Sequence, residues 1–118
     1  MNTIRKRPIG IFDSGIGGLT VAKSVFNLLP NEDVIYLGDT ARLPYGTKSK
    51  ETVILYSIES LKFLLSKKVK MVIVACNTAS SVAVPFLQKI SKIPIIGVIA
   101  PGSKAASEKT KNARIGVI

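Results

Sequence analysis

Residues 71–78 read Met-Val-Ile-Val-Ala-Cys-Asn-Thr, a short apolar run that ends on a cysteine and two polar residues. Five successive apolar positions are typical of a strand that is covered on both faces, as in a parallel sheet. The residues that follow, Cys76, Asn77 and Thr78, form the expected turn into a helix. The stretch therefore predicts a buried strand over residues 71–75 that places a thiol at the start of a helix.

Strand-like and helix-like segments alternate on both sides of this stretch. Further strands are expected at residues 8–12, 34–37, 95–99 and 114–118, and helices at residues 19–29, after Ser49, at 79–90 and at 103–111. Pro85 should kink or divide the third helix near Ala83. This order predicts a doubly wound α/β fold with a parallel sheet, in which ligands bind beyond the carboxyl ends of the strands.

Two of the expected helices carry a clear apolar face, which should pack on the sheet. In the first helix this face is formed by Leu19, Ala22, Val25, Phe26 and Leu29. In the second helix, which Ser49 is expected to cap, it is formed by Ile54, Ile58, Leu61 and Leu65.

The composition excludes several classes of site. The 118 residues include one cysteine and no histidine, so an internal disulfide cannot form and a Cys/His metal site is not expected. No apolar run approaches the about 20 residues that span a bilayer, so we expect a cytoplasmic protein without membrane contact. The formal charge of +10 makes nucleic-acid binding a possible function, but the scattered lysines and an aromatic content of 6% argue against it.

Cys76 is the candidate reactive group. A thiol at a helix N-terminus lies near unpaired backbone N–H groups and the positive end of the helix dipole, and both favour the thiolate. A thiolate can act as a nucleophile or as a base in proton transfer. The alternative is that Cys76 is a small buried apolar residue, the usual environment of a lone cysteine. The neighbouring Asn77 and Thr78 favour a functional role, because they lie at the edge where ligands bind.

A glycine-rich segment, Asp13-Ser14-Gly15-Ile16-Gly17-Gly18, follows the first expected strand. Its glycines permit a sharp turn, and the helix start that follows can bind an anion. The spacing does not match the dinucleotide fingerprint, and no Walker A lysine follows. The alternative is a tight turn that Asp13 caps. Asp13 and Ser14 face the same crevice as Cys76 if the first and third strands are neighbours.

The loop after the second expected strand carries two further candidates. Asp39 either faces the same crevice or caps its own loop. The segment Leu43-Pro44-Tyr45-Gly46 supplies a turn and a phenol, and its alternative interpretation is a surface turn with Tyr45 packed on its neighbours.

Taken together, four motifs resemble those of bacterial glutamate racemases, members of the Asp/Glu racemase superfamily. They are Ile9-Gly10-Ile11-Phe12-Asp13-Ser14-Gly15-Ile16-Gly17-Gly18-Leu19-Thr20-Val21, Leu43-Pro44-Tyr45-Gly46 with Lys48, Val74-Ala75-Cys76-Asn77-Thr78-Ala79-Ser80, and Ile93-Pro94-Ile95-Ile96-Gly97-Val98-Ile99. The resemblance runs in the same order from about Ile9 to Ile118.

The resemblance implies a cofactor-independent isomerase that interconverts L- and D-glutamate and supplies D-glutamate for peptidoglycan synthesis. It also implies a homodimer. In the family, two cysteines on opposite faces of the substrate Cα transfer the proton, and Cys76 matches the first of them. Asp13 matches a residue that contacts the substrate amino group and helps to set the proton positions.

The same resemblance implies the remaining substrate contacts. Ser14 would contact the amino group beside Asp13. The turn of Pro44, Tyr45 and Gly46 would hold the side-chain carboxylate through backbone N–H groups. The α-carboxylate would be bound beside Cys76, by Asn77 and Thr78.

The sequence departs from the family pattern in one respect. Family members run to about twice this length, in two α/β domains, and their second cysteine lies in the later half beside a Thr-His pair. We therefore expect a truncated chain, in which residues 1–99 form the first domain and residues 100–118 begin the second. With one cysteine, these 118 residues are not expected to racemise glutamate on their own.

Two other functions stay open at this point. One is a different enzyme of the superfamily, such as an aspartate or hydantoin racemase, or a decarboxylase that uses one cysteine. The other is a non-catalytic basic binding module, whose binding would depend on salt and for which Cys76 would be dispensable.

Overall fold

The computed structural model describes residues 3–117, which form a four-stranded parallel sheet with the strand order β2-β1-β3-β4. The strands are β1 (Ile9–Asp13), β2 (Val34–Gly38), β3 (Met71–Val74) and β4 (Ile95–Gly97). All three neighbouring pairs are parallel, and β1 lies between β2 and β3. The predicted parallel α/β fold is therefore confirmed, and so is the expectation that the first and third strands are neighbours.

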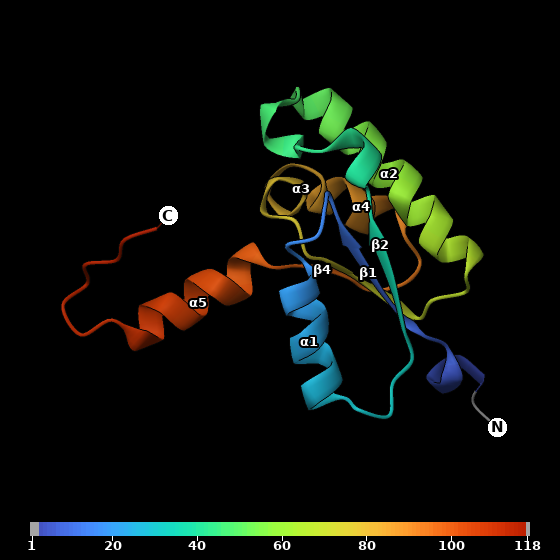
Figure 1. Cartoon of the computed structure of the whole chain (residues 1–118), viewed down its shortest axis with the longest axis horizontal. Coiled ribbons are helices and arrows are strands. Elements are labelled where there is room, and N and C mark those ends of the chain that lie inside the picture. The colour runs from blue at the N-terminus through green and yellow to red at the C-terminus, as the bar shows by residue number, and fades with distance from the viewer. Residues whose placement is uncertain (1–2, 118) are drawn as a thin grey trace.

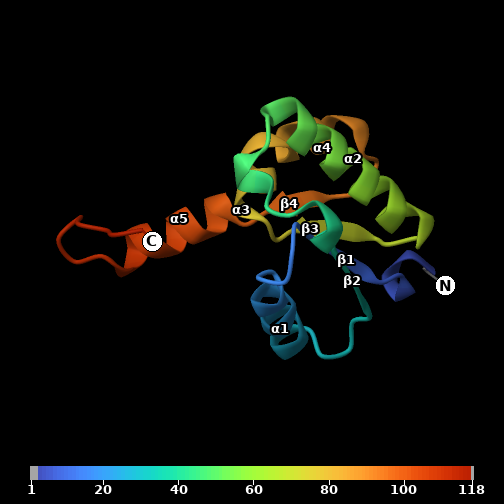
Figure 2. The ribbon, with the colours of Figure 1, turned by 45° about the horizontal axis from the view of Figure 1, so that its top comes forward.

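Helices cover both faces of this sheet. Helix α1 (Leu19–Leu28) lies alone on one face, whereas α2 (Lys50–Ser66), α3 (Asn77–Val82) and α4 (Val84–Ile90) lie on the other (Figures 1 and 2). Helix α5 (Ile99–Lys109) projects away from the sheet, and none of its residues is buried. Three short 3-10 helices complete the described chain: η1 (Thr3–Lys6), η2 (Thr40–Arg42) and η3 (Tyr45–Thr47).

Helix α2 begins where the sequence predicts it, and most of its predicted inner face packs on the core, with Leu61 buried and Ile54 and Ile58 partly buried. The Ser49 side chain caps it and accepts a hydrogen bond from the Thr52 backbone N–H at 3.2 Å. Leu65, expected on the inner face, is 39% exposed. The buried stripe consists of Val53, Ser57, Ser60, Leu61 and Leu64. Apolar spacing does not reveal the two buried serines, which widen the inner face beyond the predicted stripe.

The predicted apolar face of the first helix is only partly buried, and the third predicted helix is divided in two. On α1, Ala22 and Val25 are buried, whereas Leu19, Phe26 and Leu29 are exposed. The third helix is divided at Ala83 as Pro85 predicts, with α3 ending at Val82 and α4 beginning at Val84. On α4, Val84 and Leu87 are buried, whereas Phe86 and Ile90 are exposed.

The segment from β4 onward differs from the predictions in three places. Strand β4 stops at Gly97 and not at residue 99, because the Val98 N–H donates to the Ser80 hydroxyl at 3.2 Å and no longer continues the ladder. Helix α5 starts at Ile99 and not at 103, with Pro101 in its first turn, where proline is tolerated. The strand expected at 114–118 is wrong over residues 114–117, since α5 carries this segment away from any partner strand; Ile118 lies outside the described residues.

No helix within residues 3–117 is long and apolar enough to cross a membrane.

Candidate functional site

A cleft of about 590 Å³ opens beyond the carboxyl ends of β1 and β3. Four loops line it, those that follow β1, β2, β3 and β4. The residues predicted to act on or bind the substrate all line it: Asp13, Ser14, Pro44, Tyr45, Gly46, Cys76, Asn77 and Thr78. Asp39 does not line this cleft, and its carboxylate instead accepts hydrogen bonds from Arg42 and Tyr45 within its own loop. The lining is completed by Gly15, Gly17, Gly18, Thr20, Val21, Ala75 and Val98.

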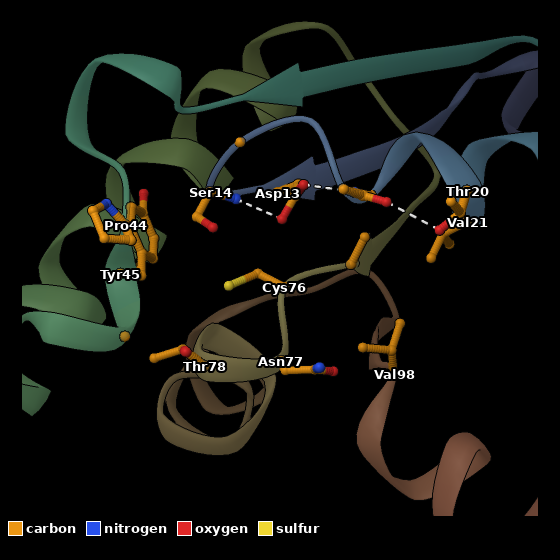
Figure 3. A pocket seen from close by; sticks show the side chains of 15 residues that line it. Asp13, Ser14, Thr20, Val21, Pro44, Tyr45, Cys76, Asn77, Thr78 and Val98 are labelled. Atoms are coloured by element: carbon orange, nitrogen blue, oxygen red, sulfur yellow. Dashed lines mark hydrogen bonds between the residues drawn. The ribbon is translucent and has the colours of Figure 1, made fainter. Parts of the chain in front are cut away.

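Strand pairing brings the first two loops together. Phe12 and Val74 are register partners in β1 and β3, and the Ala75 N–H donates to the Phe12 carbonyl oxygen at 2.7 Å. Asp13, the last residue of β1, and Cys76, two residues beyond the end of β3, therefore lie at the same edge of the sheet, and both line the cleft (Figure 3).

Asp13 is 4% exposed, and backbone donors surround its carboxylate. One oxygen accepts the N–H of Ser14 at 2.8 Å, and the other accepts the N–H of Gly18 at 2.7 Å. The turn-capping interpretation of Asp13 is therefore confirmed for its hydrogen bonds. The same side chain lines the cleft, so it also places negative charge at the wall of the site.

Tyr36 is a site residue that the sequence analysis missed. Its hydroxyl lies 3.1 Å from the Asp13 carboxylate and 3.1 Å from the Gly15 carbonyl oxygen. Burial, together with the neighbouring charge of Asp13, raises the pKa of Tyr36 to about 12. Register could have found it: Asp13 pairs with Gly38 of β2, and Tyr36, two residues earlier, lies on the same face of that strand.

Cys76 is 6% exposed and is itself the N-cap of α3. Its sulfur accepts the Ala79 backbone N–H at 3.4 Å. The thiol points into the open part of the cleft, between Ser14 and Thr78 (Figure 3). A sulfur that accepts a backbone N–H has one donor in place to stabilise a thiolate.

The two residues after Cys76 point to different parts of the cleft. Thr78 faces the loop after β2, since a Cβ added at Gly46 would lie 3.6 Å from its hydroxyl oxygen. Asn77 is exposed, and its side chain turns away from Thr78 toward Val98 (Figure 3). Both residues line the cleft, so their contact with the α-carboxylate stays a prediction.

The turn of Pro44, Tyr45 and Gly46 closes one side of the cleft. The Tyr45 side chain is 1% exposed, and its hydroxyl donates to Asp39, so the phenol is directed into the protein. Burial and the Asp39 contact raise the pKa of Tyr45. The interpretation of Tyr45 as packed on its neighbours is correct for the ring. The first N–H groups of η3 have no acceptor within their own helix, so the turn can offer backbone donors to the cleft.

Within residues 3–117, no group of three or more His, Cys, Asp or Glu side chains is placed to hold a metal ion. The cleft instead combines a thiol, a buried carboxylate, the hydroxyl groups of Ser14, Thr20 and Thr78, and backbone donors at helix starts. This set can bind an anionic ligand and exchange a proton with it.

Comparisons with known proteins agree on one family. Residues 9–118 match the family described as Asp/Glu/Hydantoin racemase. A glutamate racemase from Geobacter metallireducens is 55% identical over 112 residues, which are 95% of this chain and 42% of that protein.

Solved structures give the same result for the fold. The glutamate racemase from Aquifex pyrophilus matches with a TM-score of 0.89 and 53% identity, over 92% of this chain and 43% of that one. The Francisella tularensis glutamate racemase, solved with D-glutamate, matches with a TM-score of 0.81 and 52% identity, over 85% of this chain and 38% of that one. The chain thus spans about two-fifths of the length of these relatives.

Proposed function

Because the chain belongs to the Asp/Glu/hydantoin racemase family, we propose that its cleft is one half of a glutamate racemase site, with Cys76 as one of two catalytic thiols. The observation that carries the proposal is the thiol of Cys76, directed into a cleft whose walls are the loops of Asp13 and Tyr45. Relatives more than half identical to this chain are named glutamate racemases, and one was solved with D-glutamate.

The proposed step is the removal of the α-proton of glutamate. The Cys76 thiolate takes the proton and becomes a thiol, and the electron pair of the broken C–H bond stays on Cα. An α-proton is very weakly acidic, so donors at the two carboxylates have to stabilise the carbanion in a site that is largely closed to water. No cofactor is needed for this chemistry.

Inversion at Cα needs a second acid on the opposite face. A thiol on that face gives its proton to the carbanion while Cys76 keeps the first proton, and the reverse reaction exchanges their roles. The 118 residues contain one cysteine. By themselves they are therefore proposed to remove and return a proton on one face only.

The lining suggests a place for each polar group of glutamate. The ammonium group would lie beside Asp13 and Ser14, where the buried carboxylate attracts it. The α-carboxylate would lie by Thr78 and Asn77, with Thr78 as the closer neighbour of the thiol. The side-chain carboxylate would accept backbone N–H groups from the turn of Pro44, Tyr45 and Gly46.

Asp13 is proposed to act on proton transfer through its charge. Its oxygens already accept three donors, from Ser14, Gly18 and Tyr36. A carboxylate held in this way orients the substrate ammonium group and contributes to the electrostatic potential at the Cys76 sulfur. It does so while keeping its own hydrogen bonds.

Proton exchange in D₂O tests the proposal directly. Each glutamate enantiomer is incubated with the chain, and α-deuterium is measured by mass spectrometry while chirality is followed by chiral chromatography. We expect deuterium in one enantiomer without inversion, and none with Cys76→Ser. Inversion by the purified chain would contradict the one-face proposal, and exchange that survives Cys76→Ser would contradict the role of the thiol.

The wider role follows from the same proposal. A longer chain that supplies the second thiol would provide D-glutamate for peptidoglycan in the cytoplasm and would act as a homodimer. Restoration of growth in a D-glutamate auxotroph by such a chain, and its loss with Cys76→Ser, tests the first part. Sedimentation equilibrium tests the second.

A further inference from the structure

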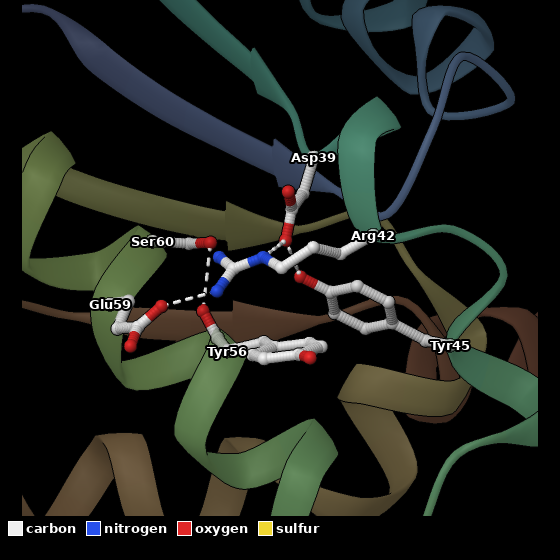
Figure 4. A network of polar contacts seen from close by, with 6 residues as sticks. All are labelled: Asp39, Arg42, Tyr45, Tyr56, Glu59 and Ser60. Carbon is white, nitrogen blue, oxygen red and sulfur yellow. Dashed lines mark hydrogen bonds and ion pairs between the residues drawn. The ribbon is translucent and has the colours of Figure 1, made fainter.

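A network of polar side chains lies behind the turn that closes the cleft. It joins Asp39, Arg42 and Tyr45 of the loop after β2 to Tyr56 and Glu59 of α2 (Figure 4). The loop has only short 3-10 helices between β2 and α2. Its position at the cleft therefore depends on side-chain contacts rather than on a strand ladder.

Tyr45 connects this network to the cleft. Its ring packs between Phe12 of β1 and Tyr56 of α2, with ring centroids 6.0 and 5.8 Å away. Its hydroxyl donates to Asp39, whose side chain is only 11% exposed. Because Gly46 follows Tyr45 directly in the chain, the contacts that hold this buried ring also restrain the backbone that faces Thr78.

Arg42 fixes Asp39 in turn. Its Nε donates to the Asp39 carboxylate at 2.8 Å, and its other arm pairs with Glu59. The guanidinium carbon lies 3.9 Å from the centre of the Tyr56 ring. A planar cation that is held by two carboxylates and one ring leaves Asp39 little freedom.

We propose that Asp39 and Arg42 are positioning residues that set the place of the Tyr45–Gly46 backbone, and so the affinity of the cleft for a carboxylate. Neither residue needs to touch the ligand. This inference rests on the proposed function for the identity of the ligand, but the placement of the turn can be measured without any ligand.

An ion pair that serves only stability would behave differently. The matched pair is Lys70–Glu32, in which the Lys70 and Glu32 side chains are 16% and 32% exposed. It lies at the amino end of the sheet, where Lys70 precedes β3 and Glu32 precedes β2, away from the cleft. Its loss can lower stability without moving the Tyr45–Gly46 backbone.

The test compares Asp39→Asn, Arg42→Gln and Tyr45→Phe with the control Glu32→Gln by ¹H–¹⁵N NMR of the 118-residue chain. Tyr45→Phe removes one hydroxyl and keeps the ring, so it preserves the fold if a charge variant does not. The Gly46 and Thr47 amide resonances are expected to move in the same direction in the first three variants and to stay in place in Glu32→Gln.

Titration with L-glutamate, D-glutamate and glutarate then measures the dissociation constants. We expect about five- to tenfold weaker binding in Asp39→Asn and in Tyr45→Phe, and no change in Glu32→Gln. The double variant Asp39→Asn/Tyr45→Phe should bind no more weakly than Asp39→Asn alone, since the Tyr45 hydroxyl acts through its hydrogen bond to Asp39. Unmoved Gly46 and Thr47 resonances, or equal weakening in Glu32→Gln, would overturn the positioning role. Moved resonances in a chain that binds none of the three ligands would support the positioning role and contradict glutamate as the substrate.

Discussion

At the carboxyl end of the sheet the loops touch one another, whereas at the amino end most residues of the described connections are exposed, although Val69 is buried. A Cβ added at Gly38 would overlap the Gly15 carbonyl oxygen, and one added at Gly18 would lie 2.9 Å from the Asp13 Cβ. At the other end, η1 is fully exposed, and Lys68 adopts a left-handed backbone with a φ of 58°. The difference indicates that close packing is concentrated where the cleft is built.

The largest effect is expected for Gly38→Ala, at the closest approach of two loops. The new methyl group collides with the backbone of Gly15, so the loop that carries Asp13 has to shift. Overpacking of this kind costs about 2–3 kcal/mol. Urea unfolding followed by circular dichroism measures this loss.

Gly17→Ala is the matched control, in the loop between β1 and α1 that Gly38 contacts. No atom lies within 4 Å of a Cβ built at Gly17, so we expect a change within about 0.5 kcal/mol. Equal losses in the two variants would mean that the loop tolerates substitution poorly everywhere, and the contrast would then not come from the contact between Gly38 and Gly15.

Tyr36→Phe probes the same end with a smaller change. It removes the hydroxyl that donates to Asp13. A hydrogen bond to a charged group stabilises the folded state by about 1.5–3 kcal/mol, and the easier burial of a ring without a hydroxyl offsets part of its loss. We expect a loss of about 1 kcal/mol by urea unfolding, and slower α-proton exchange in D₂O. An unchanged exchange rate would contradict a role for Tyr36 in holding Asp13.

The pKa of Tyr36 adds a pH dependence to this prediction. Its folded-state value of about 12 lies above the ordinary 10.0, so the folded state holds the phenol proton more tightly than the unfolded state does. This contribution to stability is complete below pH 10 and is lost as the pH rises to 12. Tyr36→Phe should therefore lose less stability over that window than the parent chain, as measured by urea midpoints at several pH values.

The sequence predicts the parts of the cleft that depend on local chemistry. The ends of two strands are marked in the sequence, one by Cys76 after an apolar run and the other by glycines after the first strand. Because the carboxyl ends of parallel strands lie at the same edge of a sheet, these two segments are expected to lie close together. The sequence does not predict contacts that depend on register or on buried polar side chains. Tyr36 reaches Asp13 only because β2 pairs with β1, and Ser80 ends β4 through a hydrogen bond between segments distant in the chain.

Lys68→Gly tests the open end of the sheet. Lys68 follows the C-terminus of α2, and its N–H donates to the Leu65 carbonyl oxygen at 2.9 Å. Glycine adopts a positive φ without the strain of a Cβ, so we expect a gain of about 0.5–1 kcal/mol by thermal unfolding. Lys67→Gly, at a φ of −87°, removes a lysine without relieving strain and should not stabilise the chain.

The smallest effect is expected for Glu32→Gln, which breaks the ion pair with Lys70. The Lys70 ammonium keeps its hydrogen bond to the Arg5 carbonyl oxygen at 2.8 Å, and both side chains retain contact with water. Such pairs contribute about 0–1 kcal/mol, so the loss should be below about 0.5 kcal/mol and should shrink further in 1 M salt. A loss as large as that of Tyr36→Phe, independent of salt, would mean that side-chain contacts at the amino end stabilise the fold as much as those at the cleft. The contrast between the two ends would then fail.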